Sequence, residues 1–161
     1  MKKTIVISAF PGCGKSHFFR ENKDKIILDS DSSLFSWVEK GVRNPDFPNN
    51  YITHIKKNIG KADIILVSSH KVVRDALVEN GIDFILVYPS RSIKNSYIQR
   101  YIDRGSDENF IKLLINKWDE FLDELENQKH CRKIELQKGQ YLSDVIENIN
   151  EKYRIKKFKD F

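Results

Sequence analysis

Short apolar runs alternate along the chain with longer stretches in which apolar residues recur at helical spacing. Continuous apolar runs of four or five residues, rich in β-branched side chains, are typical of parallel strands that are covered on both faces. The pattern predicts five strands, over residues 4–8, 25–29, 63–68, 83–88 and, less strongly, 132–136.

Helical patterns separate these runs. The predicted helices cover residues 16–22, 32–40, 49–58, 71–79, 107–127 and a last segment at 142–149. Gly41, Gly60 and Gly81 follow three of them, where a helix C-cap favours glycine, and Ser106 is the expected N-cap of the longest. Alternating strands and helices predict an α/β fold with a five-stranded parallel sheet and helices on both faces.

The length of 161 residues and a hydrophobic fraction of 40% suit one domain with one core. We expect this domain to span residues 1–150, followed by a basic tail at 151–161. No apolar run approaches the roughly 20 residues that cross a bilayer, so no membrane association is expected. Cys13 and Cys131 have neither disulfide-framework nor metal-ligand spacing, which favours the reducing cytoplasm. The net charge of +5 suits anionic partners such as nucleotides, nucleic acid or acidic lipids.

A glycine-rich segment follows the first strand and precedes the first helix. Residues 9–16 read Ala-Phe-Pro-Gly-Cys-Gly-Lys-Ser, which matches the phosphate-loop pattern Gly-x-x-x-x-Gly-Lys-[Ser/Thr] except at its first position. The two glycines let backbone N–H groups turn toward an anion, to which the start of the helix adds its positive end. Lys15 can reach the β- and γ-phosphates of ATP, and the Ser16 hydroxyl can bind Mg²⁺. The predicted nucleotide-binding residues are Pro11, Gly12, Cys13, Gly14, Lys15, Ser16 and His17.

Two residues of this loop need separate comment. Ala9 stands where the pattern has glycine, which disfavours a left-handed backbone there but leaves the anion cradle intact. A helix start can lower the pKa of the Cys13 thiol and make it sensitive to oxidation. The simpler interpretation, a small loop residue, is the one that we favour.

Candidate acids follow the second strand, because the carboxyl ends of parallel strands share one edge of the sheet. We predict that Asp31 orients or deprotonates an acceptor hydroxyl, or holds Mg²⁺ together with Ser16; the alternative is that it only caps the next helix. Asp29 is a second candidate for the metal. The third strand ends with Ser68, Ser69 and His70, where many phosphate-loop enzymes carry an acid.

Basic residues follow the third and fourth strands. His70 and Arg74 are four apart on one helix face, so either could touch an acceptor, although His70 could also be a cap. Residues 91–106 predict a small hinged lid that closes over the site and excludes water. In it Arg100 and Arg104 share a helix face, and we predict that both neutralise charge during phosphoryl transfer. The alternative is a solvated arginine face.

With these motifs in place, the chain resembles the small P-loop kinases of the adenylate-kinase-like superfamily, such as the nucleoside and nucleotide kinases of phage genomes. Residues 1–125 are also similar in part to the kinase domain of phage polynucleotide kinase. Asp31 falls where that family keeps a hydroxyl-activating aspartate, and Arg104 falls where it keeps a lid arginine. The resemblance implies ATP with Mg²⁺ as donor and a hydroxyl or phosphate acceptor. Ser69 replaces the family's aspartate, the arginine after Asp31 is absent, and so is a second, phosphatase-type domain.

These features predict an ATP-dependent phosphotransferase that acts on a nucleoside or nucleoside monophosphate in the cytoplasm, that of the host if the protein is encoded by a phage. A polynucleotide 5′-hydroxyl kinase, which would bind the 5′ end of single-stranded nucleic acid, is the second hypothesis. A nucleotide-binding ATPase switch without a small acceptor is the third.

Overall fold

The computed structural model describes residues 3–30, 37–39 and 42–145. The sheet strands are β1 (Ile5–Ala9), β2 (Ile27–Asp29), β5 (Ile64–Ser68), β6 (Ile85–Pro89) and β7 (Arg132–Leu136). The helices are α1 (Lys15–Glu21), α3 (Asn49–Asn58), α4 (Lys71–Glu79), α5 (Lys94–Asp103) and α6 (Glu108–Glu126), with a 3₁₀ turn η1 (Arg91–Ile93) before α5. No helix in the described ranges has both the length and the apolar character needed to cross a membrane.

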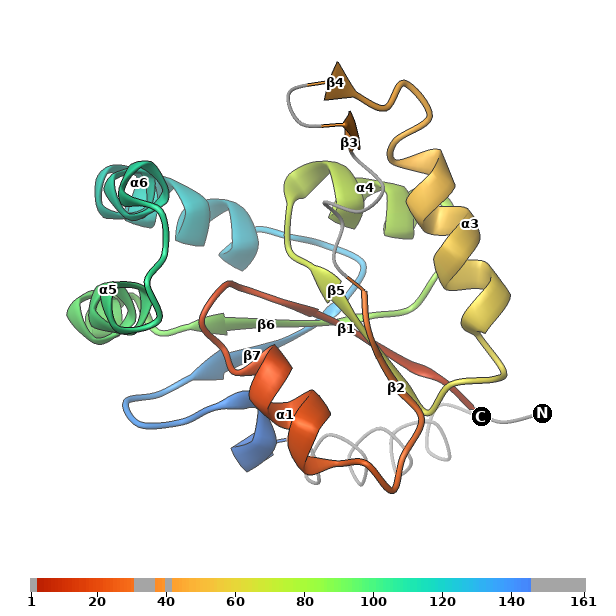
Figure 1. Ribbon diagram of the computed structural model, residues 1–161, viewed down its shortest axis with the longest axis horizontal. Coiled ribbons are helices and arrows are strands. Elements are labelled where there is room, and N and C mark those ends of the chain that lie inside the picture. The colour runs from red at the N-terminus through yellow and green to blue at the C-terminus, as the bar shows by residue number, and fades with distance from the viewer. Residues whose placement is uncertain (1–2, 31–36, 40–41, 146–161) are drawn as a thin grey trace.

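The five strands form one parallel sheet in the order β2-β5-β1-β6-β7, which confirms the predicted α/β fold. The central strand β1 lies between β5 and β6, so the loop that follows it emerges at the middle of the sheet. Figure 1 shows α1 and the helical turn that begins at Leu142 on one face, and α3, α4 and α6 on the other. The chain passes from β1 to β2 at one edge of the sheet, and then returns through β5 and β6 to β7 at the other edge. Because crossovers are right-handed, connections that run in opposite directions place their helices on opposite faces.

Burial explains why the strand sequences are continuously apolar. Every residue of β5 and β6 is buried, and so are the last four residues of β1. Because helices cover both faces of the sheet, the side chains on both faces enter the core. The strands therefore lack the alternation of apolar and polar residues that is seen when one face is exposed to water. Removing these side chains from water is the main stabilising contribution to the sheet.

The predicted helix at 32–40 is wrong in its last turn. Trp37–Glu39 instead form strand β3, which pairs antiparallel with β4 (Val42–Arg43) in a two-stranded ribbon. Trp37 and Val38 have side chains that favour extended backbone, and tertiary context overrides a helical pattern as short as this one. The rest of that predicted helix, together with Gly41, lies outside the described residues.

Helix ends agree with expectation at two glycines and differ at one cap. Gly60 and Gly81 have φ of 94° and 65°, as the ends of α3 and α4 require. The N-cap of α6 is Asp107 and not Ser106, because the Asp107 carboxylate accepts a hydrogen bond from the Asn109 amide at 2.8 Å.

The tail at 151–161 lies outside the described residues, and only residues 142–145 of the predicted last helix are described.

Candidate functional site

The glycine-rich loop connects β1 directly to α1. Gly12 and Gly14 have φ of 90° and 93°, a left-handed backbone conformation that residues with a Cβ rarely adopt. Gly14 is also the N-cap residue of α1. Ala9 is the buried last residue of β1 and has no positive φ, as the sequence predicted. The first position of the motif is therefore extended strand in this protein and needs no glycine.

Hydrogen bonds from outside the loop fix the direction of its peptide groups. Three consecutive carbonyls accept them: Pro11 from the Tyr101 hydroxyl at 2.7 Å, Gly12 from Arg100 Nη1 at 2.7 Å, and Cys13 from the Leu142 amide at 2.8 Å. In a trans peptide the N–H points away from the preceding carbonyl. The amides of Gly12 and Gly14 therefore point toward the side of the loop opposite to these donors. The Cys13 amide instead donates to the Phe10 carbonyl at 3.2 Å, so the amides of Gly12 and Gly14 are the two that remain to face an anion.

Arg100 is sandwiched between two aromatic rings on the outer side of the loop. Its guanidinium carbon lies 4.3 Å from the centroid of the Tyr97 ring and 4.0 Å from that of Tyr141. A planar cation between two rings gains cation–π attraction on both faces. This position makes Arg100 a residue that supports the loop. Its predicted part in charge neutralisation stays a prediction.

Arg104 lies in a different environment. It is exposed, its Nε donates to the Ser106 hydroxyl at 2.9 Å, and its guanidinium lies 5.1 Å from the centroid of the Tyr101 ring. It follows the end of α5, where a cation is favourable because the helix carbonyls end there. Arg104 is thus less constrained than Arg100, and its predicted contact with a transferred phosphoryl group also stays a prediction.

Cys13 is completely buried in the loop. Its Sγ lies 3.5 Å from the Tyr97 hydroxyl oxygen, and burial raises the pKa of the thiol to about 11. The helix start therefore does not lower this pKa, because the loss of solvation outweighs the nearby positive charges. The favoured interpretation, a small loop residue, agrees with the structure. Burial also raises the pKa values of Tyr97 and Tyr101.

The predicted metal ligand Ser16 lies in the first turn of α1, after the half-buried Lys15. The Ser16 hydroxyl donates to Asp29 Oδ2 at 3.4 Å, so the end of β2 reaches the start of α1. A hydroxyl and a carboxylate are oxygen ligands that suit Mg²⁺, which binds few protein groups when phosphate and water complete its shell. The described residues hold no cluster of three or more His, Cys, Asp or Glu side chains with metal-site geometry. Asp31 lies outside the described ranges, and His17 is exposed on α1.

Ser68 ends β5 beside the start of the loop, since it pairs with Ala9 in the parallel register. Its hydroxyl is buried and has no hydrogen-bond partner in the described part of the chain. An unsatisfied buried hydroxyl costs about 1–3 kcal/mol, so a bound water at this point would stabilise the protein. Ser68 thus places a polar oxygen at the strand end where many phosphate-loop enzymes carry an acid.

Helix α3 fixes the residue that follows Asp29. The Ser30 carbonyl accepts a hydrogen bond from the Tyr51 hydroxyl at 2.6 Å, and the Ser30 hydroxyl lies 3.0 Å from His54 Nε2. The Ser30 amide also donates to Leu66 on β5 at 2.9 Å. These contacts hold the chain between Asp29 and Asp31. Sequence reasoning missed Tyr51 and His54, whose only signal is a spacing of three residues on one helix face.

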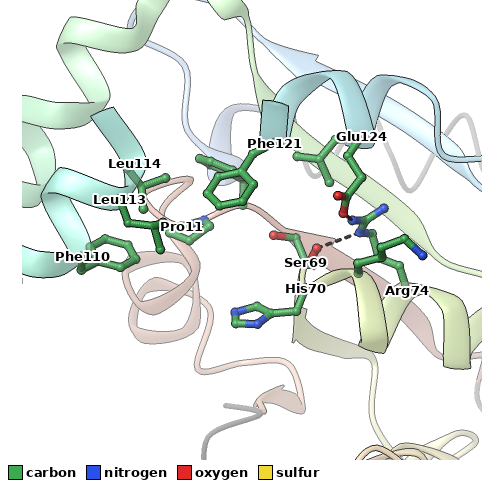
Figure 2. Close-up of a pocket in the computed structure, with 12 residues that line it drawn as sticks. Pro11, Ser69, His70, Arg74, Phe110, Leu113, Leu114, Phe121 and Glu124 are labelled. Atoms are coloured by element: carbon green, nitrogen blue, oxygen red, sulfur yellow. Dashed lines mark hydrogen bonds and ion pairs between the residues drawn. The ribbon is translucent and has the colours of Figure 1, made fainter. Parts of the chain in front are cut away.

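A cavity of about 350 Å³ lies beside the loop, between the end of β5, α4 and α6. Figure 2 shows Phe110, Leu113 and Leu114 on one side of it and Arg74 with Glu124 on the other, with Pro11 of the loop and His70 also at its wall. His70 is the N-cap residue of α4 and lines the cavity, in line with the expectation that it could meet an acceptor.

Arg74 also lines this cavity, but its guanidinium binds other groups of the protein, so the contact with an acceptor that the sequence suggested stays a prediction. Its side chain is 3% exposed and joins α4 to α6 through an ion pair with Glu124. It also donates to the Ser69 carbonyl at 2.7 Å and to Gln128 Oε1 at 2.5 Å. A buried guanidinium needs such partners, because an unpaired charge in the core is very costly.

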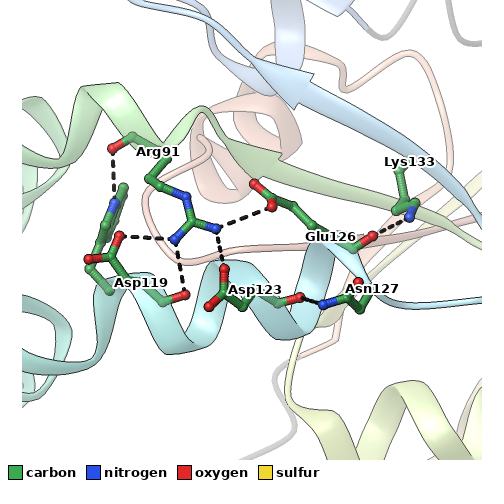
Figure 3. A network of polar contacts seen from close by, with 7 residues as sticks. Arg91, Asp119, Asp123, Glu126, Asn127 and Lys133 are labelled. Atoms are coloured by element: carbon green, nitrogen blue, oxygen red, sulfur yellow. Dashed lines mark hydrogen bonds and ion pairs between the residues drawn. The ribbon is translucent and has the colours of Figure 1, made fainter.

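The predicted lid segment at 91–106 is packed against the rest of the protein in this structure. Figure 3 shows Arg91 in contact with three carboxylates of α6, those of Asp119 (3.0 Å), Asp123 (2.6 Å) and Glu126 (3.2 Å). These carboxylates raise the pKa of Arg91 above its usual value. The buried rings of Tyr97 and Tyr101 anchor α5 to the loop. Hinged motion of this segment stays a prediction.

The sequence matches no protein-family model and no curated protein. Among solved structures, the fold is similar to that of a tunicamycin resistance protein of Deinococcus radiodurans, with a TM-score of 0.63 and 13% sequence identity over 95% of this chain and 96% of that one. It is also similar to an uncharacterized protein of Eubacterium ventriosum, with a TM-score of 0.50 and 17% identity over 95% of this chain and 98% of that one. At these identities the likeness shows the α/β fold over nearly the whole chain.

Proposed function

We propose that the protein is a P-loop phosphotransferase of the adenylate-kinase-like kind, which transfers the γ-phosphoryl group of ATP to a small acceptor. The observation that carries this proposal is the preorganised loop between β1 and α1. Gly12 and Gly14 have a left-handed backbone, and the carbonyls of Pro11 and Cys13 accept hydrogen bonds from outside the loop. This leaves the Gly12 and Gly14 amides to face an anion, with Lys15 and Ser16 next in the chain. That combination supports a triphosphate better than a single anion, because lysine and the amides can bind successive phosphates.

In this proposal each residue of the loop has a distinct part. The amides of Gly12 and Gly14 bind phosphate oxygens, and Lys15 neutralises charge on the β- and γ-phosphates. Ser16 and Asp29 would hold Mg²⁺, which neutralises phosphate charge when bound. Asp31 is assigned the activation of the acceptor hydroxyl, as in the family that the sequence resembles.

The cavity beside the loop supports a small acceptor. A volume of about 350 Å³ is at the low end of the range of pockets that enclose small molecules. The nucleoside or nucleoside monophosphate expected from the sequence has this size. A cavity of this size favours such acceptors over a nucleic acid strand, which would need an extended groove.

The test is the dependence of nucleotide binding and phosphotransfer on Lys15. We expect the protein to bind ATP in the presence of Mg²⁺ by calorimetry, and Lys15→Ala to reduce transfer from labelled ATP about 10²-fold or more. Lys23→Ala, which changes an exposed lysine just after α1, is the matched control and should leave both measurements unchanged. Failure of the wild-type protein to bind any nucleoside triphosphate, or full transfer by Lys15→Ala, would refute the proposal.

A further inference from the structure

We propose that the acceptor is an uncharged, hydroxyl-bearing molecule with an apolar body, bound in the cavity between the loop, α4 and α6. This inference rests on the proposed function and narrows its acceptor. It favours an uncharged alcohol over a nucleoside monophosphate. Three properties of the cavity carry it: its apolar wall, the pairing of the cations that line it, and its position.

The wall formed by α6 is apolar and partly open. Phe110, Leu113, Leu114 and Phe121 of this helix line the cavity, and Phe10 and Pro11 line it from the loop. Leu113 is 47% exposed even though it faces this cavity. A bound molecule with an apolar body would remove this surface from water, at about 25 cal/mol for each Å² buried. Such a wall contributes nothing to the recognition of a phosphate dianion.

The described cations that line the cavity are each paired with a carboxylate. Arg74 binds Glu124 and two further oxygen acceptors, and its buried guanidinium has little capacity left. Lys71 Nζ lies 2.6 Å from Asp75 Oδ2 on the exposed side of α4. Displacing Glu124 from the buried Arg74 is unfavourable, and so is placing an anion against the apolar wall without a counter-ion; the exposed Lys71 pair contributes less.

The position of the cavity fits a hydroxyl acceptor. Pro11 belongs both to the cavity wall and to the loop that is assigned the phosphates, so a molecule in the cavity adjoins the γ-phosphoryl position. In the reaction, the acceptor oxygen forms a bond to the γ-phosphorus and the bond from this phosphorus to the bridging oxygen of ADP breaks. The hydroxyl proton is released to solvent. The products are a phosphate monoester and ADP, and no further reactant is required.

The first experiment compares matched acceptors. Transfer from labelled ATP would be measured with phenyl β-glucoside, octyl β-glucoside and glucose, which share hydroxyl groups but differ in their apolar part, and with adenosine, AMP and UMP. We expect kcat/KM to be at least tenfold higher for the better apolar glucoside than for glucose, and the monophosphates to be the poorest acceptors. Preference for a monophosphate over every uncharged acceptor would overturn the inference.

The second experiment changes the cavity wall with opposite charges. Leu113→Lys and Leu113→Glu should both raise KM for the best uncharged acceptor about tenfold, because either charge disrupts an apolar contact. Ile115→Glu is the matched control: Ile115 lies on the same helix at 40% exposure and does not line the cavity, so KM should stay at the wild-type value. A wild-type KM for this acceptor in both Leu113 variants, or an equal rise in KM in Ile115→Glu, would overturn the inference.

A direct binding measurement separates the two proposals. The uncharged fluorophore N-phenyl-1-naphthylamine should bind the wild-type protein and be displaced by the glucosides but not by AMP, and both Leu113 variants should weaken its binding. Calorimetry with ATP and Mg²⁺ is carried out on the same samples. If ATP binds while AMP displaces the fluorophore, the acceptor inference fails and the phosphotransferase proposal stands. If no nucleoside triphosphate binds, the phosphotransferase proposal fails and the acceptor inference fails with it.

Discussion

Arg100 donates a hydrogen bond of 2.7 Å to the carbonyl of Gly12, and its guanidinium is held between the rings of Tyr97 and Tyr141. This contact joins α5 to the loop after β1 across 88 residues of sequence. The amide of the same peptide group, that of Cys13, donates to the Phe10 carbonyl at 3.2 Å, so both polar groups of this peptide are held within the protein. The orientation of the loop is thus set by a side chain that lies outside it.

Replacement of Arg100 by Ala should therefore weaken both the fold and nucleotide binding. We expect the free energy of unfolding in urea to fall by about 1–3 kcal/mol, through loss of a charged hydrogen bond and two cation–π contacts. The Kd for ATP should rise several-fold because the loop loses its support. Arg100→Lys keeps the charge but not the planar stacking, so it should recover little of the loss. A fall in kcat alone, with unchanged stability and Kd, would show that Arg100 acts on the transferred phosphoryl group instead.

Arg104→Ala should give the opposite pattern. Its side chain is exposed and bonds to Ser106 on the same surface, so stability should change by less than about 0.5 kcal/mol. If Arg104 stabilises the developing charge, kcat should fall about 10²-fold or more while the Kd for ATP changes little. Thermal unfolding and steady-state kinetics on the same preparation give the two numbers. Unchanged kcat would place Arg104 in the solvated surface that was its alternative interpretation.

Gly12 should tolerate a side chain less well than Gly81, another glycine with positive φ. A Cβ at this residue would lie 3.1 Å from Tyr101 Cε1 and 3.2 Å from Tyr97 Cδ2, in addition to the strain of a left-handed backbone. Gly81 also has positive φ, but a Cβ there would meet nothing within 4 Å. Gly81→Ala should thus cost only the backbone strain of about 1–2 kcal/mol, and Gly12→Ala should cost more than this. Equal losses in urea unfolding would show that the tyrosines move aside.

Much of the fold could be predicted from the sequence, because apolar runs and glycines report local requirements. The strands of the sheet follow from runs such as Ile64–Ser68, and Gly12 and Gly14 mark the loop by their residue type. What could not be predicted depends on contacts between distant segments. Burial of Cys13 under α5 reverses the pKa shift expected from a helix start. Nothing near Arg74 in the sequence indicates that its charge will be paired with Glu124, 50 residues later.

The pair formed by Arg74 and Glu124 offers a test of that burial. Glu124→Gln leaves the guanidinium of Arg74 in the core with its two neutral acceptors and no counter-ion, so we expect a loss of about 1–3 kcal/mol in the free energy of unfolding. Asp123→Asn, the neighbouring substitution on α6, removes one of three carboxylates around the exposed Arg91 and should change stability little. Urea unfolding of the two variants in parallel compares their free energies of unfolding. A loss in Asp123→Asn as large as in Glu124→Gln would contradict the assignment.

Cys13 makes stability depend on pH in the alkaline range. The thiol has a pKa of about 11 in the folded protein against 9.0 ordinarily, so the unfolded chain releases this proton first as the pH rises. The contribution of Cys13 to the free energy of unfolding is therefore fully present below pH 9, and about 2–3 kcal/mol is lost between pH 9 and pH 11. Urea unfolding across this range should show wild-type stability falling relative to Cys13→Ala, which lacks the titrating group. Burial also raises the pKa of the partly buried Cys131, so Cys131→Ala should remove a smaller part of the wild-type decline than Cys13→Ala does. Parallel curves for wild type and Cys13→Ala would mean that Cys13 titrates near its ordinary pKa and is open to solvent.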